Sequence, residues 1–200
     1  MKSSTKCGYV AIIGLPNVGK STLLNAMVLK KISIVTHKVQ TTRTQIQAIL
    51  SKDCSQVIFI DTPGIFQPRK QKEKALVREA WKSLDLADVI IFVHDATKDM
   101  KEESLSLLRE ISDNKIELVV VINKIDLVDK EKLLNLIDVI KVKNGASNIH
   151  LISALKYDGV VGLIDDVKNK IPIGEWIYSK EISTNISDRS IAEEFTREKI

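Results

Sequence analysis

The chain has 200 residues, of which 44% are hydrophobic and 28% charged, and its net charge is +4. This length suits one globular domain with a short appendage. The sequence contains no run of about eighteen apolar residues, so no transmembrane helix is predicted. Aromatic residues make up only 4%, which argues against a base-stacking surface, and two widely spaced cysteines, Cys7 and Cys54, predict neither a disulfide framework nor a zinc site.

Apolar runs and amphipathic segments alternate along the chain. Their periodicity predicts strands at 10–13, 44–50, 56–60, 88–93, 117–122 and 148–152. It predicts helices at 22–29, 73–86, 101–112, 130–143 and 160–171. Residues 51–55 are predicted to form a turn. Most strands are apolar on both faces, which indicates an α/β fold: a mostly parallel sheet, covered by helices on both faces, that binds ligands at the carboxyl ends of its strands.

The first predicted strand ends at a phosphate-binding motif of the form GxxxxGK[ST]. The motif is Gly14-Leu15-Pro16-Asn17-Val18-Gly19-Lys20-Ser21, and Thr22 follows it in the predicted nucleotide-binding set. Its glycines allow backbone N–H groups to face phosphate oxygens, and the following helix adds partial positive charge. We expect Lys20 to contact the β- and γ-phosphates and Ser21 to bind Mg²⁺. A glycine-rich turn before a helix is the simpler alternative.

Two further segments fit a nucleotide bound with Mg²⁺. The third predicted strand ends at Asp61-Thr62-Pro63-Gly64, and Ile65 completes this part of the predicted set. Asp61 is expected to hold Mg²⁺ through water, and Gly64 to offer its N–H to the γ-phosphate. In the polar loop before residue 44, Thr42 is the expected Mg²⁺ ligand in the GTP state, ahead of Thr41, and loses this contact when the γ-phosphate leaves. The alternatives are an ordinary turn and a solvated loop.

The predicted base-binding residues follow the last two strands. Asn123-Lys124-Ile125-Asp126 has the form NKxD. Asp126 can accept hydrogen bonds from guanine N1–H and the 2-amino group, whereas adenine would leave this carboxylate without donors. Asn123 would bond the base edge or tie neighbouring loops, and Lys124 would lay its stem over the ring. Backbone N–H groups of Ser153-Ala154-Leu155 could meet guanine O6. The expected ligands are therefore GTP and GDP.

Together these motifs resemble the bacterial Era GTPases, over roughly residues 7–172. The resemblance also includes Lys31-Ile32-Ser33-Ile34 and Gln40-Thr41-Thr42-Arg43. It implies a P-loop NTPase domain at 1–174, with a six-stranded small-GTPase sheet, that hydrolyses GTP as a molecular switch. Ile65 stands where Ras-like enzymes carry a water-orienting glutamine. The resemblance therefore implies slow, potassium-stimulated hydrolysis, with Asn17 as a K⁺ ligand and with Asn17, Lys20, Thr42 and Gly64 as the catalytic set.

The tail at 175–200 resembles the linker and first helix of the family's C-terminal KH domain. The matching residues are Ser187-Asp188-Arg189 and Glu194-Phe195-Thr196-Arg197-Glu198-Lys199. The sequence ends before the strands and GxxG loop that clamp RNA in a KH domain, so we expect a truncated KH domain. The family implies binding of the small-subunit 16S rRNA during ribosome assembly, a cytoplasmic location and possible peripheral contact with the inner face of the membrane. DNA is not an expected partner.

Two alternative functions stay open at this stage. The chain could be a non-catalytic GTP-binding remnant, which a hydrolysis assay would distinguish from an enzyme. It could also be a tRNA-modification GTPase of the TrmE kind, although no helical domain flanks the predicted GTPase domain.

Overall fold

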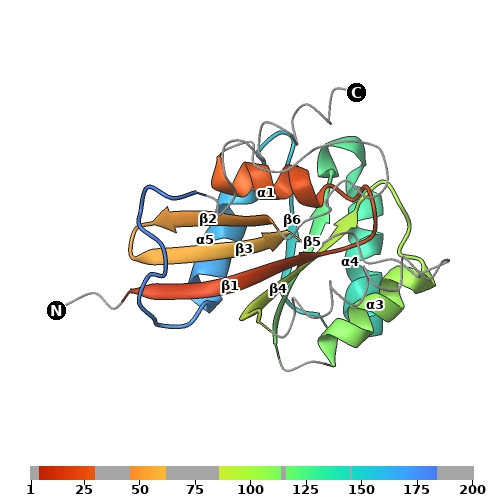
Figure 1. The fold of residues 1–200 in the computed structure, drawn as a ribbon. Coiled ribbons are helices and arrows are strands. Elements are labelled where there is room, and N and C mark those ends of the chain that lie inside the picture. Colours follow the sequence, from red (N-terminus) through yellow and green to blue (C-terminus); the bar gives the residue numbers. More distant parts are fainter. Residues whose placement is uncertain (1–4, 30–45, 62–85, 114–115, 145, 184–200) are drawn as a thin grey trace, which may run out of the picture.

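The structure, a computed structural model, describes residues 5–29, 46–61, 86–113, 116–144 and 146–183. They form one sheet with helices packed on both faces (Figure 1). The strands are β1 Lys6–Ile13, β2 Ile46–Lys52, β3 Ser55–Asp61, β4 Val89–Asp95, β5 Glu117–Asn123 and β6 Ile149–Leu151. The helices are α1 Lys20–Val28, α3 Glu102–Ser112, α4 Lys130–Asn144, α5 Val160–Lys170 and the short 3₁₀ helix η1 Ile125–Leu127. Within these ranges, no helix has the length and apolarity needed to cross a membrane.

The six strands lie in the order β2-β3-β1-β4-β5-β6. All neighbouring pairs are parallel except β2 and β3, which form an antiparallel hairpin at one edge. The prediction of a mostly parallel six-stranded α/β sheet is therefore confirmed. Because β1, β4, β5 and β6 run the same way, the segments that follow them meet at one edge of the sheet.

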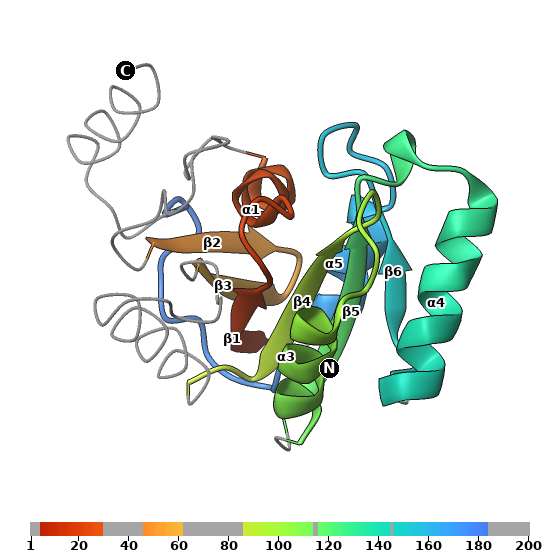
Figure 2. The same cartoon turned by 90° about the vertical axis from the view of Figure 1, so that its right-hand side faces the viewer.

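Alternating side chains of each central strand enter two different cores. Val10 and Ile12 of β1 pack with α1 and α5, whereas Ala11 and Ile13 pack with α3 and α4. The turned view in Figure 2 shows α3 and α4 on the side of the sheet opposite α1. A strand buried on both faces has no polar face, which explains the continuous apolar runs in the sequence.

The hairpin between β2 and β3 is tighter than predicted. Ladder pairing continues to Ser51 with Gln56 and Lys52 with Ser55, so the turn is only Asp53-Cys54 and the predicted turn at 51–55 is wrong. Asp53 has a φ of 55°, in the left-handed region. Its carboxylate accepts a hydrogen bond from Lys168 of α5 at 2.7 Å. Three of the five polar residues at 51–55, namely Ser51, Lys52 and Ser55, therefore belong to the strands, because strand pairing satisfies their backbone groups.

The other predicted elements agree with the structure to within a few residues at their ends. The exception is the helix predicted at 73–86, which lies outside the described residues except for Leu86, a turn residue.

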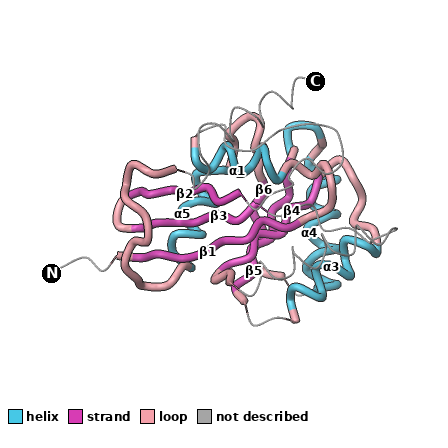
Figure 3. The backbone as a smooth tube through the Cα atoms, viewed as in Figure 1, coloured by secondary structure: helices cyan, strands magenta, loops and turns pink. Residues whose placement is uncertain are grey.

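The segment from Ile171 to Ser183 runs back along the sheet at the end opposite the β1–α1 loop (Figures 1 and 3). It pairs first with the start of β1, where Cys7 N donates to Pro172 O at 3.1 Å and Gly174 N to Thr5 O at 3.0 Å. It then reaches β2, where Ile49 N donates to the carbonyl oxygen of Ser183 at 2.8 Å. This segment therefore crosses the strands of the sheet from β1 to its edge.

One buried side chain, Gln56 of β3, fixes the middle of this segment. Its Oε1 accepts hydrogen bonds from the N–H groups of Ile177 and Tyr178, both at 2.9 Å. Its Nε2 donates to the carbonyl oxygen of Tyr178 at 2.8 Å and to Ser51 Oγ at 3.0 Å. Trp176 and Tyr178 pack beside it on a small apolar cluster that includes Ile49 and Ile58. The amide therefore supplies the backbone bonds that a neighbouring strand would otherwise make.

We expect Gln56→Leu to lower the free energy of unfolding by about 2–4 kcal/mol, because three backbone groups of the 171–183 segment lose buried partners. Urea denaturation measures this change, and proteolysis between residues 174 and 183 should accelerate. The matched control is Asn169→Leu on the exposed side of α5, where about 0.5 kcal/mol or less is expected. Equal stabilities of the two variants would contradict this account of Gln56.

Candidate functional site

Residues 14–19 form the loop between β1 and α1, called the phosphate loop below. Both of its glycines stand where a side chain cannot fit. A Cβ on Gly19 would lie 2.3 Å from Nδ2 of Asn123, and one on Gly14 would lie 2.4 Å from the carbonyl oxygen of Val93. Gly19 also has a φ of 99°, which glycine adopts without strain. Glycine at both positions therefore lets the phosphate loop pack directly on β4 and β5.

Lys20 begins α1 and folds its side chain back over the phosphate loop. Its buried ammonium donates hydrogen bonds to the carbonyl oxygens of Gly14 at 3.2 Å and Leu15 at 3.1 Å. Ser21 and Thr22 follow, both half-buried. The first turn of α1 has no acidic residue, and no side chain of the described residues caps it. The positive end of the helix dipole therefore meets the phosphate loop without a competing negative charge, as anion binding requires.

The buried side-chain amide of Asn123, at the end of β5, joins three loops. Its Nδ2 donates a hydrogen bond to the carbonyl oxygen of Val18 in the phosphate loop at 3.0 Å. Its Oδ1 accepts one from the backbone N–H of Ala154, also at 3.0 Å. Of the two roles predicted for Asn123, these bonds match the tying of neighbouring loops. The amide thus fixes the 123–126 segment and the 153–155 loop against the phosphate loop.

Lys124 spans the same junction on its exposed side. Its ammonium donates to the carbonyl oxygen of Asn17 at 2.9 Å and to Asp95 Oδ2 at 2.6 Å. Asp95 ends β4 and pairs with Asn123 across the β4–β5 ladder. Burial by itself raises the pKa of Asp95, but the hydrogen bonds from Lys124 and Thr97 outweigh it and hold this pKa below its ordinary value. Asp95 is therefore a buried carboxylate held in its ionised form.

The sequence analysis missed Asp95, although the sequence holds a signal for it. Like Asp61, it is a carboxylate at the carboxyl end of a largely apolar strand, in a position that carries other site residues in this sheet. No motif contains it, so its partner Lys124 could be found only from the structure.

The two remaining base-binding segments lie beside Asn123. Asp126 is exposed within η1, so its carboxylate is accessible to a ligand. In the 153–155 loop, the N–H of Ser153 donates to the carbonyl oxygen of Asp158 at 3.0 Å, and the N–H of Ala154 is bonded to Asn123. Leu155 is exposed at the surface of this loop. Two of the three N–H groups predicted to meet guanine O6 therefore already have partners within the protein.

Several predicted residues lie outside what the structure describes. Thr42 and residues 62–65, which include Gly64 and Ile65, are not among the described residues, and of Asp61 only the backbone is described. The parallel register pairs Asp61 with Ile12, two residues before the phosphate loop. The backbone of Asp61 thus lies at the edge of the sheet where the other predicted residues meet.

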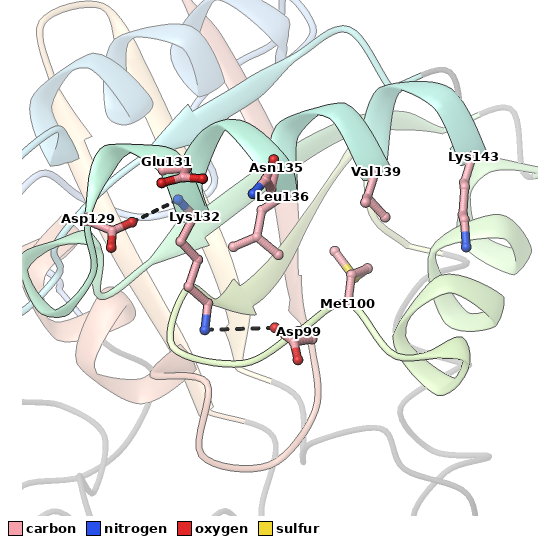
Figure 4. Close-up of a pocket in the computed structure, with 9 residues that line it drawn as sticks. All are labelled: Asp99, Met100, Asp129, Glu131, Lys132, Asn135, Leu136, Val139 and Lys143. Carbon is pink, nitrogen blue, oxygen red and sulfur yellow. Dashed lines mark hydrogen bonds and ion pairs between the residues drawn. The ribbon is translucent and has the colours of Figure 1, made fainter.

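A separate hollow of about 500 Å³ lies between α4 and the loop after β4 (Figure 4). Its lining residues are Asp99, Met100, Asp129, Glu131, Lys132, Asn135, Leu136, Val139 and Lys143, none of which belongs to the predicted nucleotide set. Lys132 donates to the carbonyl oxygen of Thr97 at 2.8 Å and lies 3.8 Å from Asp99. The hollow is therefore distinct from the junction built on Asn123.

A protein-family model described as 50S ribosome-binding GTPase matches residues 9–124. The chain belongs to this GTPase family. Among curated relatives, GTPase Era of Bradyrhizobium sp. (strain ORS 278) is 41% identical over 199 residues, covering 100% of this chain and 65% of the relative. GTPase Era of Dinoroseobacter shibae is also 41% identical, with 65% of its length covered. The chain thus spans slightly less than two thirds of these relatives.

The solved structures agree with this assignment. A crystal structure of Era in complex with MgGDPNP and nucleotides 1506–1542 of 16S ribosomal RNA matches with a TM-score of 0.92 and 38% identity, covering 98% of this chain and 67% of that chain. A variant of Aquifex aeolicus Era bound to GDP·AlF4⁻ matches with a TM-score of 0.91 and the same identity and coverage. The resemblance to Era and the small-GTPase fold, both predicted from the sequence, are confirmed.

We expect Asn123→Ala to lower the free energy of unfolding by about 2–4 kcal/mol, because the Val18 carbonyl and the Ala154 N–H lose buried partners. Urea denaturation without nucleotide measures this effect separately from ligand binding. Asn135→Ala, an exposed amide on α4, is the matched control and should change stability by about 0.5 kcal/mol or less. A similar result for both variants would show that the Asn123 amide does not hold the loops together.

Proposed function

We propose that this chain binds GTP and GDP with Mg²⁺ and hydrolyses GTP to GDP and phosphate as a molecular switch. The observation that carries the proposal is the Asn123 junction. A single buried amide fixes a phosphate-binding loop and an NKxD segment against each other, so phosphate binding and base selection share one rigid frame. The Mg²⁺, GDPNP and GDP·AlF4⁻ in the Era structures support the same ligands.

Each end of the nucleotide has its own residues in this proposal. Residues 14–22 bind the phosphates, with the Lys20 ammonium near the β- and γ-phosphates. Ser21, Thr42 and Asp61 hold Mg²⁺, and residues 62–65 approach the γ-phosphate through the Gly64 N–H. At the other end, residues 123–126 and 153–155 bind the base, and Asp126 selects guanine. The uncapped start of α1 and the exposed carboxylate of Asp126 support these roles.

The biological role proposed is assembly of the small ribosomal subunit through 16S rRNA. The rRNA fragment bound to the Era neighbour supports it, and 41% identity to Era favours this role over a TrmE-like function. We propose residues 1–174 as the GTPase domain and 175–200 as a linker and the first helix of a KH domain. A cytoplasmic location and peripheral contact with the inner face of the membrane stay predictions of the family resemblance.

Asp126→Asn tests the proposal through the base. An amide at this position can donate a hydrogen bond to the 2-oxygen of xanthine, whereas it repels the 2-amino group of guanine. We expect the affinity for GTP to fall at least about 100-fold and the affinity for XTP to rise. Competition with a fluorescent guanine nucleotide measures both, with GTP hydrolysis by the unchanged protein as the reference. Failure of the unchanged protein to bind GTP, or equal preferences in both proteins, would refute the proposed ligand.

Asn17→Ala tests the proposed potassium requirement. Turnover of the unchanged protein should be at least about tenfold faster in K⁺ than in Na⁺, because a cation would stabilise charge on the transferring phosphate. The variant should lose this difference while it retains GTP affinity. Asn17 has a φ of 65°, so Asn17→Gly, which tolerates this backbone, separates loss of the amide from backbone strain. Equal rates in K⁺ and Na⁺ for the unchanged protein would refute potassium stimulation.

A further inference from the structure

We propose that Asp95 is a positioning residue for nucleotide binding, which holds the Lys124 ammonium against the phosphate loop so that the Lys124 stem covers the base. This inference rests on the proposed function, since it assumes a guanine nucleotide in the site. It adds a residue that lies outside every sequence motif of the site.

The Asp95 carboxylate is oriented by its own turn. Its Oδ1 accepts hydrogen bonds from the N–H of Thr97 at 3.0 Å and from Thr97 Oγ1 at 2.7 Å. These bonds direct its Oδ2 to Lys124, whose Nζ lies 2.6 Å away. The Asp95 side chain is 2% exposed and that of Lys124 is 32% exposed. A nearly buried carboxylate therefore faces an ammonium that retains an open side.

Lys124 has a backbone conformation that requires such support. Its φ is 66°, a left-handed value that costs a lysine free energy unless the surroundings fix it. The surrounding contacts fix both ends of the residue. At the side chain, Nζ is bonded to Asp95 and to the carbonyl oxygen of Asn17, and at the backbone, the next N–H, that of Ile125, donates to Ile152 at 3.2 Å.

The Asp95–Lys124 pair also connects two parts of the site. Asn17 belongs to the phosphate loop, Lys124 to the base-binding segment and Asp95 to the end of β4, which lies between β1 and β5 in the sheet. Without the carboxylate, the Lys124 ammonium would keep only its hydrogen bond to the Asn17 carbonyl oxygen, of these two, and the side chain would gain rotational freedom. The entropy of ordering its stem would then oppose nucleotide binding.

The proposed positioning role and the change in net charge predict opposite effects of Asp95→Asn on the rate of nucleotide release. Removing a negative charge near a bound polyanion would slow nucleotide release, whereas loss of the Lys124 anchor would accelerate it. We expect GDP release to accelerate about 10- to 100-fold, as when one partner of a buried, hydrogen-bonded charge pair is removed. Stopped-flow release of a fluorescent GDP analogue measures the rate directly.

A double-mutant cycle tests whether Asp95 acts through Lys124. In a Lys124→Met background, which keeps an apolar stem without the ammonium, Asp95→Asn should change GDP release by less than about twofold. Thermal unfolding of the nucleotide-free proteins is measured in parallel, because a purely structural role would lower stability and leave the two effects on release additive. Additive effects would overturn the proposal.

Asp99→Asn is the matched control for charge. Asp99 lies four residues after Asp95, in the loop that follows β4. Its side chain is 90% exposed, and Lys132 is its ion-pair partner (Figure 4). This variant changes net charge by the same amount and should leave GDP release within about twofold. If Asp95→Asn does not fold, Thr97→Val removes one bond to Asp95 and should accelerate release by about 2- to 10-fold.

The outcomes separate this inference from the proposed function. If the unchanged protein binds no guanine nucleotide, the proposed function fails and this inference fails with it. If the unchanged protein binds GDP but Asp95→Asn releases it at the same rate or more slowly, only the positioning role is wrong.

Discussion

The site depends on one buried hydrogen-bonding group, the side-chain amide of Asn123. Its donor bonds Val18 in one loop and its acceptor bonds Ala154 in another, and these two residues are 136 positions apart in the sequence. A buried amide needs hydrogen-bond partners for both its donor and its acceptor. The loops therefore fix the orientation of the amide, and the amide fixes the loops relative to each other. The same contact explains why residue 19 is glycine, since a Cβ there would collide with the Asn123 amide.

A second buried amide has a similar role at the other end of the sheet. Gln56 bonds backbone groups of the 171–183 segment, whereas Asn123 bonds those of the loops around the predicted nucleotide. In both places a single side chain makes hydrogen bonds to main-chain groups of non-strand segments. The two ends nevertheless serve different purposes, since Gln56 anchors the chain after α5 and Asn123 assembles a candidate binding site.

The parallel pairing of β4 and β5 also places charged groups at the site. Lys20 and Lys124 bring two positive charges to the phosphate loop, and Asp95 is the acidic residue that the described structure places against one of them. Both lysines donate to loop carbonyl oxygens, so their positions are set before any ligand arrives. Preorganised donors of this kind reduce the ordering cost of binding an anion.

The sequence by itself determined the order of strands and helices, the phosphate-binding and NKxD motifs and the family. These features depend on local periodicity and on residue types at fixed spacing, which a linear sequence displays directly. It did not determine the two-residue hairpin turn at Asp53-Cys54, the hydrogen bonds of Gln56 to residues 177 and 178, or the ion pair of Asp95 with Lys124. The hairpin was missed because its residues are polar, although they are near neighbours in the sequence. The contacts of Gln56 and Asp95 join residues 29 to 122 positions apart. Only the sheet register brings such residues together, because it fixes which strand ends are neighbours and therefore which buried polar groups must satisfy one another.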